Sequence, residues 1–125
     1  MPGAIELLAK ARAAGLKTGI VTNGRDQFQR SKVAGLGLSP YTDCVVTSGG
    51  FGCKKPDPAI FQECLSILDV TAAESVFVGD DLDADVAPAV KLGMRAVWKS
   101  PHCSQQATFC SPSLHEISAF VLANA

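Results

Sequence analysis

Four aspartates crowd one short stretch of the chain, directly after an apolar run. Within "VFVGDDLDADV" they are Asp80, Asp81, Asp83 and Asp85. Carboxylates this close repel one another, and the repulsion raises their pKa values. A hard cation such as Mg²⁺, which takes oxygen ligands, would offset that repulsion. Helix capping explains part of the cluster as well, because negative charge favours a helix N-terminus. On that basis Asp83 is expected to be a cap, and Asp81 remains either a cap or a ligand.

Further polar groups follow other apolar runs. "GIVTNG" ends in Thr22, Asn23 and Gly24, and Lys55 lies in the loop "GCKKPDP". A hydroxyl, an amide and backbone N–H groups near a helix start suit phosphoryl oxygens, and a lysine adds a compact positive charge. Taken singly, "TNG" is typical of an ordinary turn and "KKP" of a solvated loop. Together with the aspartates they predict phosphoryl chemistry, which needs positioning, charge neutralisation and a metal.

The elements that would position these groups alternate along the chain. Strands are expected over 17–23, 43–48, 75–80 and 95–100, and helices over 4–15, 26–35, 57–69, 84–93 and 113–125. This alternation predicts βαβ units in one α/β domain over residues 1–125. The expected fold is a three-layer sandwich around a parallel, doubly wound, Rossmann-like sheet of about four strands. Residues 100–113 are expected to form a loop, and Pro88 lies far inside its predicted helix. Ligands bind beyond the carboxyl ends of such strands, where the polar groups above would meet.

Composition excludes several other classes of protein. The chain has 125 residues, of which 47% are hydrophobic, and 11 basic against 12 acidic side chains leave a net charge of -1. That balance gives no basic surface for nucleic acid or for a membrane, and no apolar run approaches the roughly 20 residues that span a bilayer. The five cysteines include no C-x-x-C pair. We therefore expect reduced thiols in a cytoplasmic protein, with Cys64 in the core and the others in loops or strands.

The three motifs, in this order, resemble those of the haloacid dehalogenase-like (HAD) hydrolase superfamily. "GIVTNG" resembles its second motif, "KKPDPAIF" its third and "VFVGDDLDADV" its fourth, and the flanking segments also match. The resemblance covers nearly the whole chain. It implies a HAD-type fold and a Mg²⁺-dependent phosphatase or hydrolase that acts on a small phosphorylated metabolite through an aspartyl-phosphate.

The resemblance also implies a role for each motif residue. Thr22, Asn23 and Gly24 would bind and orient the phosphoryl group. Lys55 would offset charge on the nucleophile and on the phosphoryl oxygens, with Lys54 the less suitable neighbour. For the metal, Asp80 would bind Mg²⁺ and Asp85 would support that site.

The family's first motif, a strand followed by D-x-D-x-T/V, has no counterpart in the chain. Only 21 residues precede Thr22, and their one acidic residue is Glu6. "DLDADV" does not replace the motif, because Asp85 stands at the Thr/Val position and the other motifs would fall on the wrong side. We therefore expect a truncated, C-terminal part of a HAD core, without nucleophile or cap and inactive alone. Mg²⁺ binding is then expected to be weak or absent.

The missing strand belongs in the middle of the sheet, between 75–80 and 17–23. Its absence exposes strand edges. The chain should then close the gap, borrow a strand from a homodimer or a complementing N-terminal fragment, or be only marginally stable. A non-catalytic module that binds phosphate or Mg²⁺ is the alternative function. A phospho-receiver domain is disfavoured, because there the acidic pair comes first and the lysine last, whereas here the order is Thr22, Lys55, Asp80.

Overall fold

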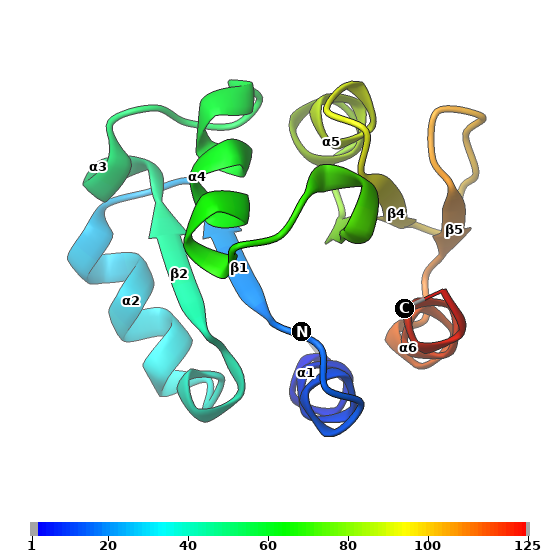
Figure 1. Ribbon diagram of the computed structural model, residues 1–125, viewed down its shortest axis with the longest axis horizontal. Helices are drawn as coiled ribbons and strands as arrows, with labels where there is room; N and C mark the ends of the chain where they lie inside the picture. The colour runs from blue at the N-terminus through cyan, green and yellow to red at the C-terminus, as the bar shows by residue number, and fades with distance from the viewer. Residues whose placement is uncertain (1–2, 125) are drawn as a thin grey trace.

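The computed structural model describes residues 3–124, and within them five parallel strands form two separate sheets (Figure 1). The first sheet pairs β1 (Gly19–Thr22) with β2 (Cys44–Thr47), in a register that sets Thr22 opposite Thr47. The second has the order β3-β4-β5, from β3 (Val76–Gly79), β4 (Arg95–Lys99) and β5 (Phe109–Ser111). The expected α/β fold with a parallel sheet is confirmed.

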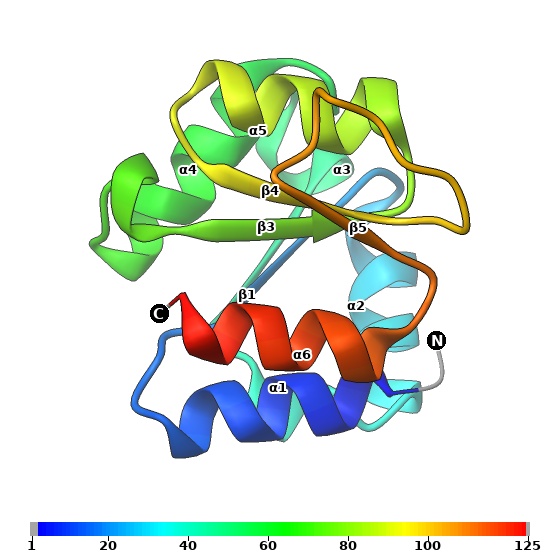
Figure 2. The same ribbon diagram turned by 90° about the vertical axis from the view of Figure 1, so that its right-hand side faces the viewer.

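Helices cover both faces of the strands, which gives three layers. They are α1 (Ala4–Ala13), α2 (Asp26–Gly35), α3 (Ser48–Phe51), α4 (Pro58–Leu68), α5 (Ala87–Lys91) and α6 (Leu114–Ala123). Short helical turns lie at Ser39–Tyr41 and Ala72–Glu74, and a π-helical turn at Leu82–Val86 leads into α5. Figure 2 shows α1 and α6 side by side on one face and α4 and α5 on the other. No helix among residues 3–124 is long and apolar enough to cross a membrane.

Helix α4 follows directly from its sequence. The Asp57 carboxylate accepts a hydrogen bond from the N–H of Ala59 at 2.9 Å, and Pro58 occupies the first turn, where its missing N–H costs nothing. One face of the helix carries Ile60 and Phe61, which are almost completely buried. The predicted cap and the predicted apolar face are both confirmed.

The larger core cluster joins the two sheets on the α4/α5 face. Its buried members include Val46 from β2, Phe61 from α4 and Ala96 from β4. The Phe61 ring packs edge-on against Phe77 of β3, with ring centroids 4.9 Å apart. Side-chain packing therefore connects the strands even though backbone hydrogen bonds do not.

Strand β5 was not predicted, because residues 100–113 were expected to be a loop. The N–H of Thr108 donates to the carbonyl of Ala96 at 2.8 Å, and the Thr108 hydroxyl accepts from the N–H of Ala96 at 3.0 Å. These bonds bring Phe109–Ser111 alongside β4. Pro88 lies inside the continuous helical stretch 82–91, as expected, at the second residue of α5, where the π-helical turn passes into the α-helix.

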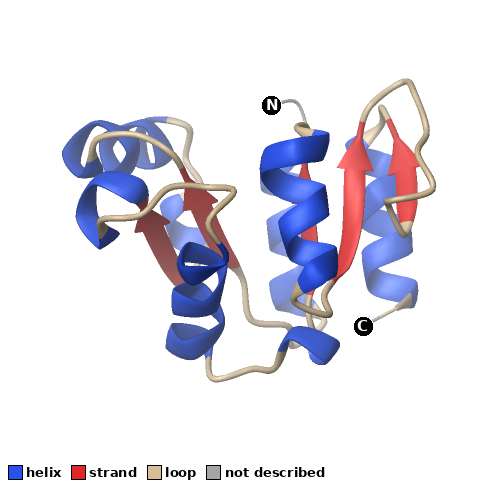
Figure 3. Ribbon diagram, turned by 90° about the horizontal axis from the view of Figure 1, so that it is seen from above, coloured by secondary structure: helices blue, strands red, loops and turns tan. Residues whose placement is uncertain are grey.

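The strands divide into two sheets between β3 and β1, where the family resemblance places a further strand. Figure 3 shows the two groups of strands side by side. Within residues 3–124, β1 pairs with β2 alone and β3 with β4 alone. Closure of the gap by the chain itself, one of three expected outcomes, is therefore wrong. One edge of each of these strands stays unpaired in the described chain.

Candidate functional site

An ion pair between Lys55 and Asp85 joins the ends of the two sheets. Lys55 Nζ lies 2.6 Å from Asp85 Oδ1, and the two side chains are 14% and 5% exposed. The other carboxylate oxygen, Oδ2, accepts a hydrogen bond from the N–H of Asp81 at 3.2 Å. The ammonium also lies 6.0 Å from the centre of the Phe77 ring. Removing either partner would leave the other charge buried and unpaired, which would destabilise the folded chain.

Asn23 fixes the backbone of Lys55. Its Oδ1 accepts from the N–H of Lys55 at 2.8 Å, and its Nδ2 donates to the carbonyl of Lys55 at 3.2 Å. The residue after β1 therefore places the lysine loop, and so brings the second and third motifs together. A direct role of Asn23 toward a phosphoryl group stays a prediction.

Thr22 and Gly24 lie at the same strand end. Thr22 is half-buried at the last position of β1, and the N–H of Gly24 donates to Ser48 Oγ at 2.8 Å. Gly24 has φ 143°, and a Cβ there would collide with the side chain of Gln29. The positive φ favours glycine here, and a Cβ would also displace the Gln29 side chain.

The four aspartates are not equivalent. Asp81 caps the turn at Leu82–Val86, because its Oδ1 accepts from the N–H groups of Asp83 and Ala84, both at 3.0 Å. The expectation that Asp83 is the cap is wrong: the turn starts one residue after Asp81, so Asp83 is a donor inside it. Asp80 is exposed, and its backbone carbonyl accepts from Trp98 Nε1 at 3.1 Å.

Gly79 makes room for the buried carboxylate, a role that the sequence reasoning missed. A Cβ at Gly79 would collide with the side chain of Asp85. The last residue of β3 must therefore be glycine for Asp85 to fold back against the strand end and reach Lys55. In the sequence, the only indication of this role is the glycine that directly precedes the first aspartate, in "GD".

Asp26 is a second carboxylate that was missed. Its Oδ1 accepts from Thr47 Oγ1 at 2.7 Å and from Arg30 Nε at 2.8 Å. These two hydrogen bonds lower the pKa of Asp26. The contact between Asp26 and Arg30 could have been predicted from the sequence, because side chains four residues apart lie on the same face of a helix.

The predicted metal ligands, Asp80 and Asp85, lie in different surroundings: Asp80 is exposed, and Asp85 is buried and paired with Lys55. Among residues 3–124 no group of three or more His, Cys, Asp or Glu side chains is placed to hold a metal ion. Asp85 Oδ1 is engaged by Lys55, and Asp80 is exposed. Mg²⁺ takes about six oxygen ligands, so further oxygens would have to come from elsewhere.

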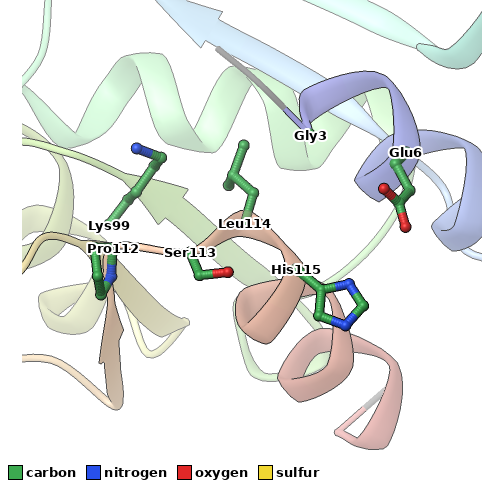
Figure 4. Close-up of a pocket in the computed structure, with 7 residues that line it drawn as sticks. All are labelled: Gly3, Glu6, Lys99, Pro112, Ser113, Leu114 and His115. Atoms are coloured by element: carbon green, nitrogen blue, oxygen red, sulfur yellow. The ribbon is translucent and has the colours of Figure 1, made fainter.

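Two hollows lie on the surface of the described chain. The first, of about 550 Å³, adjoins the end of β1 and is lined by Gly24, Arg25, Ser48, Gly49, Gly52, Cys53 and Lys54. The second, of about 330 Å³, lies at the first turns of α1 and α6, and Figure 4 shows Glu6, Lys99 and His115 among its lining residues. Gly24 lines the first hollow, whereas the second contains none of the predicted site residues.

A family model for haloacid dehalogenase-like hydrolases matches residues 1–93. The chain belongs to that family. The matched region contains all three of the HAD motifs and both partners of the Lys55–Asp85 pair, so the resemblance read from the motifs is confirmed.

Several curated proteins that resemble the chain are phosphatases. The chain is 38% identical over 113 residues to phosphoserine phosphatase of Thermus thermophilus, covering 90% of this chain and 45% of that protein. It is 41% identical over 96 residues to glyceraldehyde 3-phosphate phosphatase of Methanocaldococcus jannaschii, covering 77% and 42%. The crystal structure of a HAD phosphatase from Thermococcus onnurineus matches with a TM-score of 0.89 and 35% identity, covering 97% of this chain and 57% of that one. The chain thus spans about half the length of these relatives.

Proposed function

We propose that this chain provides the phosphoryl-binding half of a Mg²⁺-dependent HAD phosphatase that acts on a small phosphorylated metabolite, and that it is inactive alone. The observation that carries the proposal is the Lys55–Asp85 pair, which is held at the junction of two sheets by Asn23. The phosphatase activities of the relatives support the reaction class.

Each residue of the half-site has a defined part in the proposal. Lys55, held in place through its backbone and its carboxylate partner, presents a fixed positive charge toward phosphoryl oxygens. Thr22 offers its hydroxyl as a donor at the end of β1. A preorganised charge and donor stabilise a transferring phosphoryl group without reorganising during the reaction. Asp80 would contribute one ligand to Mg²⁺, which would neutralise phosphoryl charge when bound.

We infer that the nucleophile comes from outside these residues, because the family's first motif has no counterpart among them. Asp85 is bound to Lys55 and Asp81 caps the following turn, so neither carboxylate is free to attack phosphorus. A strand inserted between β1 and β3, with an aspartate at its carboxyl end, would supply the attacking group and further metal ligands. It would also pair the two open strand edges.

The inserted strand has two proposed sources. A complementing N-terminal segment would supply both the strand and the attacking aspartate, whereas a second copy of this chain would cover the open edges without adding a nucleophile. Size-exclusion chromatography with light scattering separates them. A dimer supports exchange between copies, and a chain that is aggregation-prone supports the need for an N-terminal segment. A stable monomer that resists unfolding as well as an ordinary domain of this size would contradict both.

Turnover of p-nitrophenyl phosphate tests the inactivity. The purified chain with Mg²⁺ should give no more product than the Lys55→Ala variant. The exposed Lys91, in the last turn of α5, provides a matched control as Lys91→Ala. Mg²⁺-dependent turnover that survives purification, is retained in Lys91→Ala and is lost in both Lys55→Ala and Asp80→Asn would overturn the claim.

A non-catalytic module that binds phosphate or Mg²⁺ is the second candidate, favoured by the Lys55–Asp85 ion pair, which keeps the buried carboxylate from attacking phosphorus. Calorimetric titration with inorganic phosphate and with MgCl₂ tests it. Binding of either at millimolar concentration without turnover supports a regulatory or assembly role, and the absence of any heat at that concentration contradicts it. Cytoplasmic location remains a prediction on either account.

A further inference from the structure

Two thiols from different elements touch at the end of the first sheet opposite the site. Cys44 begins β2 and Cys64 lies in α4, and their sulfur atoms are 3.4 Å apart. Both are free thiols; Cys64 is buried and Cys44 half-buried. The contact brings together residues that are 20 positions apart in the sequence.

Gly19 leaves the space that the two sulfurs share. It stands opposite Cys44 in the register of β1 and β2. A Cβ at this position would lie 2.8 Å from the sulfur of Cys64 and 2.9 Å from that of Cys44. Any larger residue would therefore push the sulfurs away, so three elements of the fold define the contact.

The surroundings make the two thiols chemically different. The hydrogen bond between them lowers the pKa of Cys44 and, together with burial, raises the pKa of Cys64. The positive charge of Arg30 also acts to lower the pKa of Cys44, although burial and Asp43 oppose it. Cys44 is thus the thiol that ionises first, and the thiolate is the reactive form.

We propose that Cys44 and Cys64 form a peroxide-reactive pair that closes to a disulfide, an inference independent of the proposed phosphatase function. The Cys44 thiolate attacks one oxygen of hydrogen peroxide, the O–O bond breaks, and hydroxide leaves and takes up a proton. Cys64 then attacks the sulfenic acid on Cys44, the S–O bond breaks, and water leaves with the Cys64 proton. The two thiols lose two electrons and the peroxide becomes two molecules of water.

Small side-chain movements suffice for the bond to form. A disulfide has its sulfurs about 2.05 Å apart, so the pair has to close by roughly 1.3 Å, shared between two side chains. The bond would tie β2 to α4 and enclose residues 44–64, which include α3 and Lys55. Because the crosslink restricts the unfolded chain, the melting temperature should rise by roughly 5–10 °C.

Peptide mapping after peroxide treatment tests the proposal on the full chain. Dilute hydrogen peroxide at neutral pH, followed by alkylation of the remaining thiols and digestion, should yield a linked peptide of Cys44 and Cys64. The Cys53→Ser variant should give the same link. In Cys64→Ser, the reaction should stop at a sulfenic acid on Cys44, which a cyclic diketone traps. The proposal would be overturned if peroxide oxidised other cysteines while Cys44 and Cys64 stayed free thiols and were recovered in alkylated form.

A matched pair of glycine variants tests the geometry. Gly19→Ala should slow formation of the link by about tenfold or more, because the added methyl group occupies the space of the sulfurs. Gly35→Ala should leave the rate unchanged, since a Cβ there meets nothing within 4 Å. Equal rates in the two variants would contradict the proposed contact. Should Gly19→Ala not fold, the mapping of Cys53→Ser and Cys64→Ser still decides the outcome.

Discussion

The two sheets carry polar groups of different kinds at their carboxyl ends. Beside β1 and β2 the side chains bind one another and the backbone: Asn23 holds Lys55, Ser48 holds Gly24 and Thr47 holds Asp26. Beside β3 the aspartates differ in their surroundings. Asp85 is buried and paired with Lys55, Asp81 caps the following turn, and Asp80 is exposed.

This difference shows which half of the site is organised. Asn23 and Asp85 fix the backbone and the side chain of Lys55, whereas residues 3–124 contain no group of three or more acidic, His or Cys side chains placed to hold a metal ion. Preorganised donors are effective because they need no rearrangement when charge develops. The Lys55–Asp85 ion pair connects the groups beside β1 and β2 with the aspartates beside β3.

Of the substitutions that test this difference between the two sheets, loss of the buried Lys55 ammonium should lower the stability most. Lys55→Met leaves Asp85 charged and unpaired at 5% exposure, which should lower the free energy of unfolding by about 3–5 kcal/mol. Urea denaturation followed by circular dichroism measures it. The adjacent, exposed Lys54 offers the control, because Lys54→Met should change stability by less than about 0.5 kcal/mol. Equal effects at both positions would show that the pair does not join the halves.

Gly79→Ala should break the same contact from the other side. The added methyl group collides with the Asp85 side chain, which has to move away from the strand end. Overpacking of this kind costs about 1–3 kcal/mol in unfolding free energy. Thermal unfolding measures the loss, with Gly35→Ala as the matched glycine variant. Unchanged stability in Gly79→Ala would mean that Asp85 does not lie against β3.

A pair of aspartate variants sharpens the separation of roles beside β3. Asp81→Ala removes the acceptor for two backbone N–H groups and should cost about 1 kcal/mol, whereas Asp83→Ala should be within about 0.5 kcal/mol of the parent. Chemical denaturation of both variants provides the measurement. The reverse order would restore Asp83 as the cap.

The smallest expected effect concerns the titration of Asp26. Hydrogen bonds from Thr47 and Arg30 lower its pKa from the ordinary value of 3.8, so the carboxylate should stay ionised to lower pH than a free aspartate. A lowered folded-state pKa contributes stability above the unfolded value of 3.8, and that contribution is lost as the pH falls through the folded value. NMR titration of the carboxyl carbon measures the shift, and Thr47→Val should return it toward 3.8. An unshifted pKa in the parent chain would contradict the network beside β1 and β2.

Local patterns predicted the parts of the fold that depend on local forces. The prediction of helix α4 was correct because its cap, its proline and its apolar face lie within one short segment. Strand β5 was missed because the bonds that align it run from Thr108 to Ala96, 12 residues earlier in the chain. Asp83 was expected to be a cap and Asp81 was left open as a cap or a ligand, because every aspartate in the stretch is a chemically suitable cap and only the start of the turn decides between them.

The candidate site was predicted residue by residue, but its contacts were not. Thr22, Asn23 and Gly24 lie at the end of β1, as the alternation of strands and helices required, and Asn23 bonds the backbone of Lys55 in the loop before α4. That Asp85 would pair with Lys55 depends on the packing of one sheet against the other, and Gly79 matters only once that pairing exists. Such contacts between distant segments leave no local pattern in the sequence.

A double-mutant cycle at Lys55 and Asp85 tests most directly whether one ion pair joins the two halves. The variants are Lys55→Met, Asp85→Asn and the two combined, each unfolded in urea under the same conditions. Because each single change strands a buried partner, the double variant should be more stable than the sum of the single losses predicts, by about 2 kcal/mol or more. Losses that add to within about 0.5 kcal/mol would show that Lys55 and Asp85 act independently and would contradict the account.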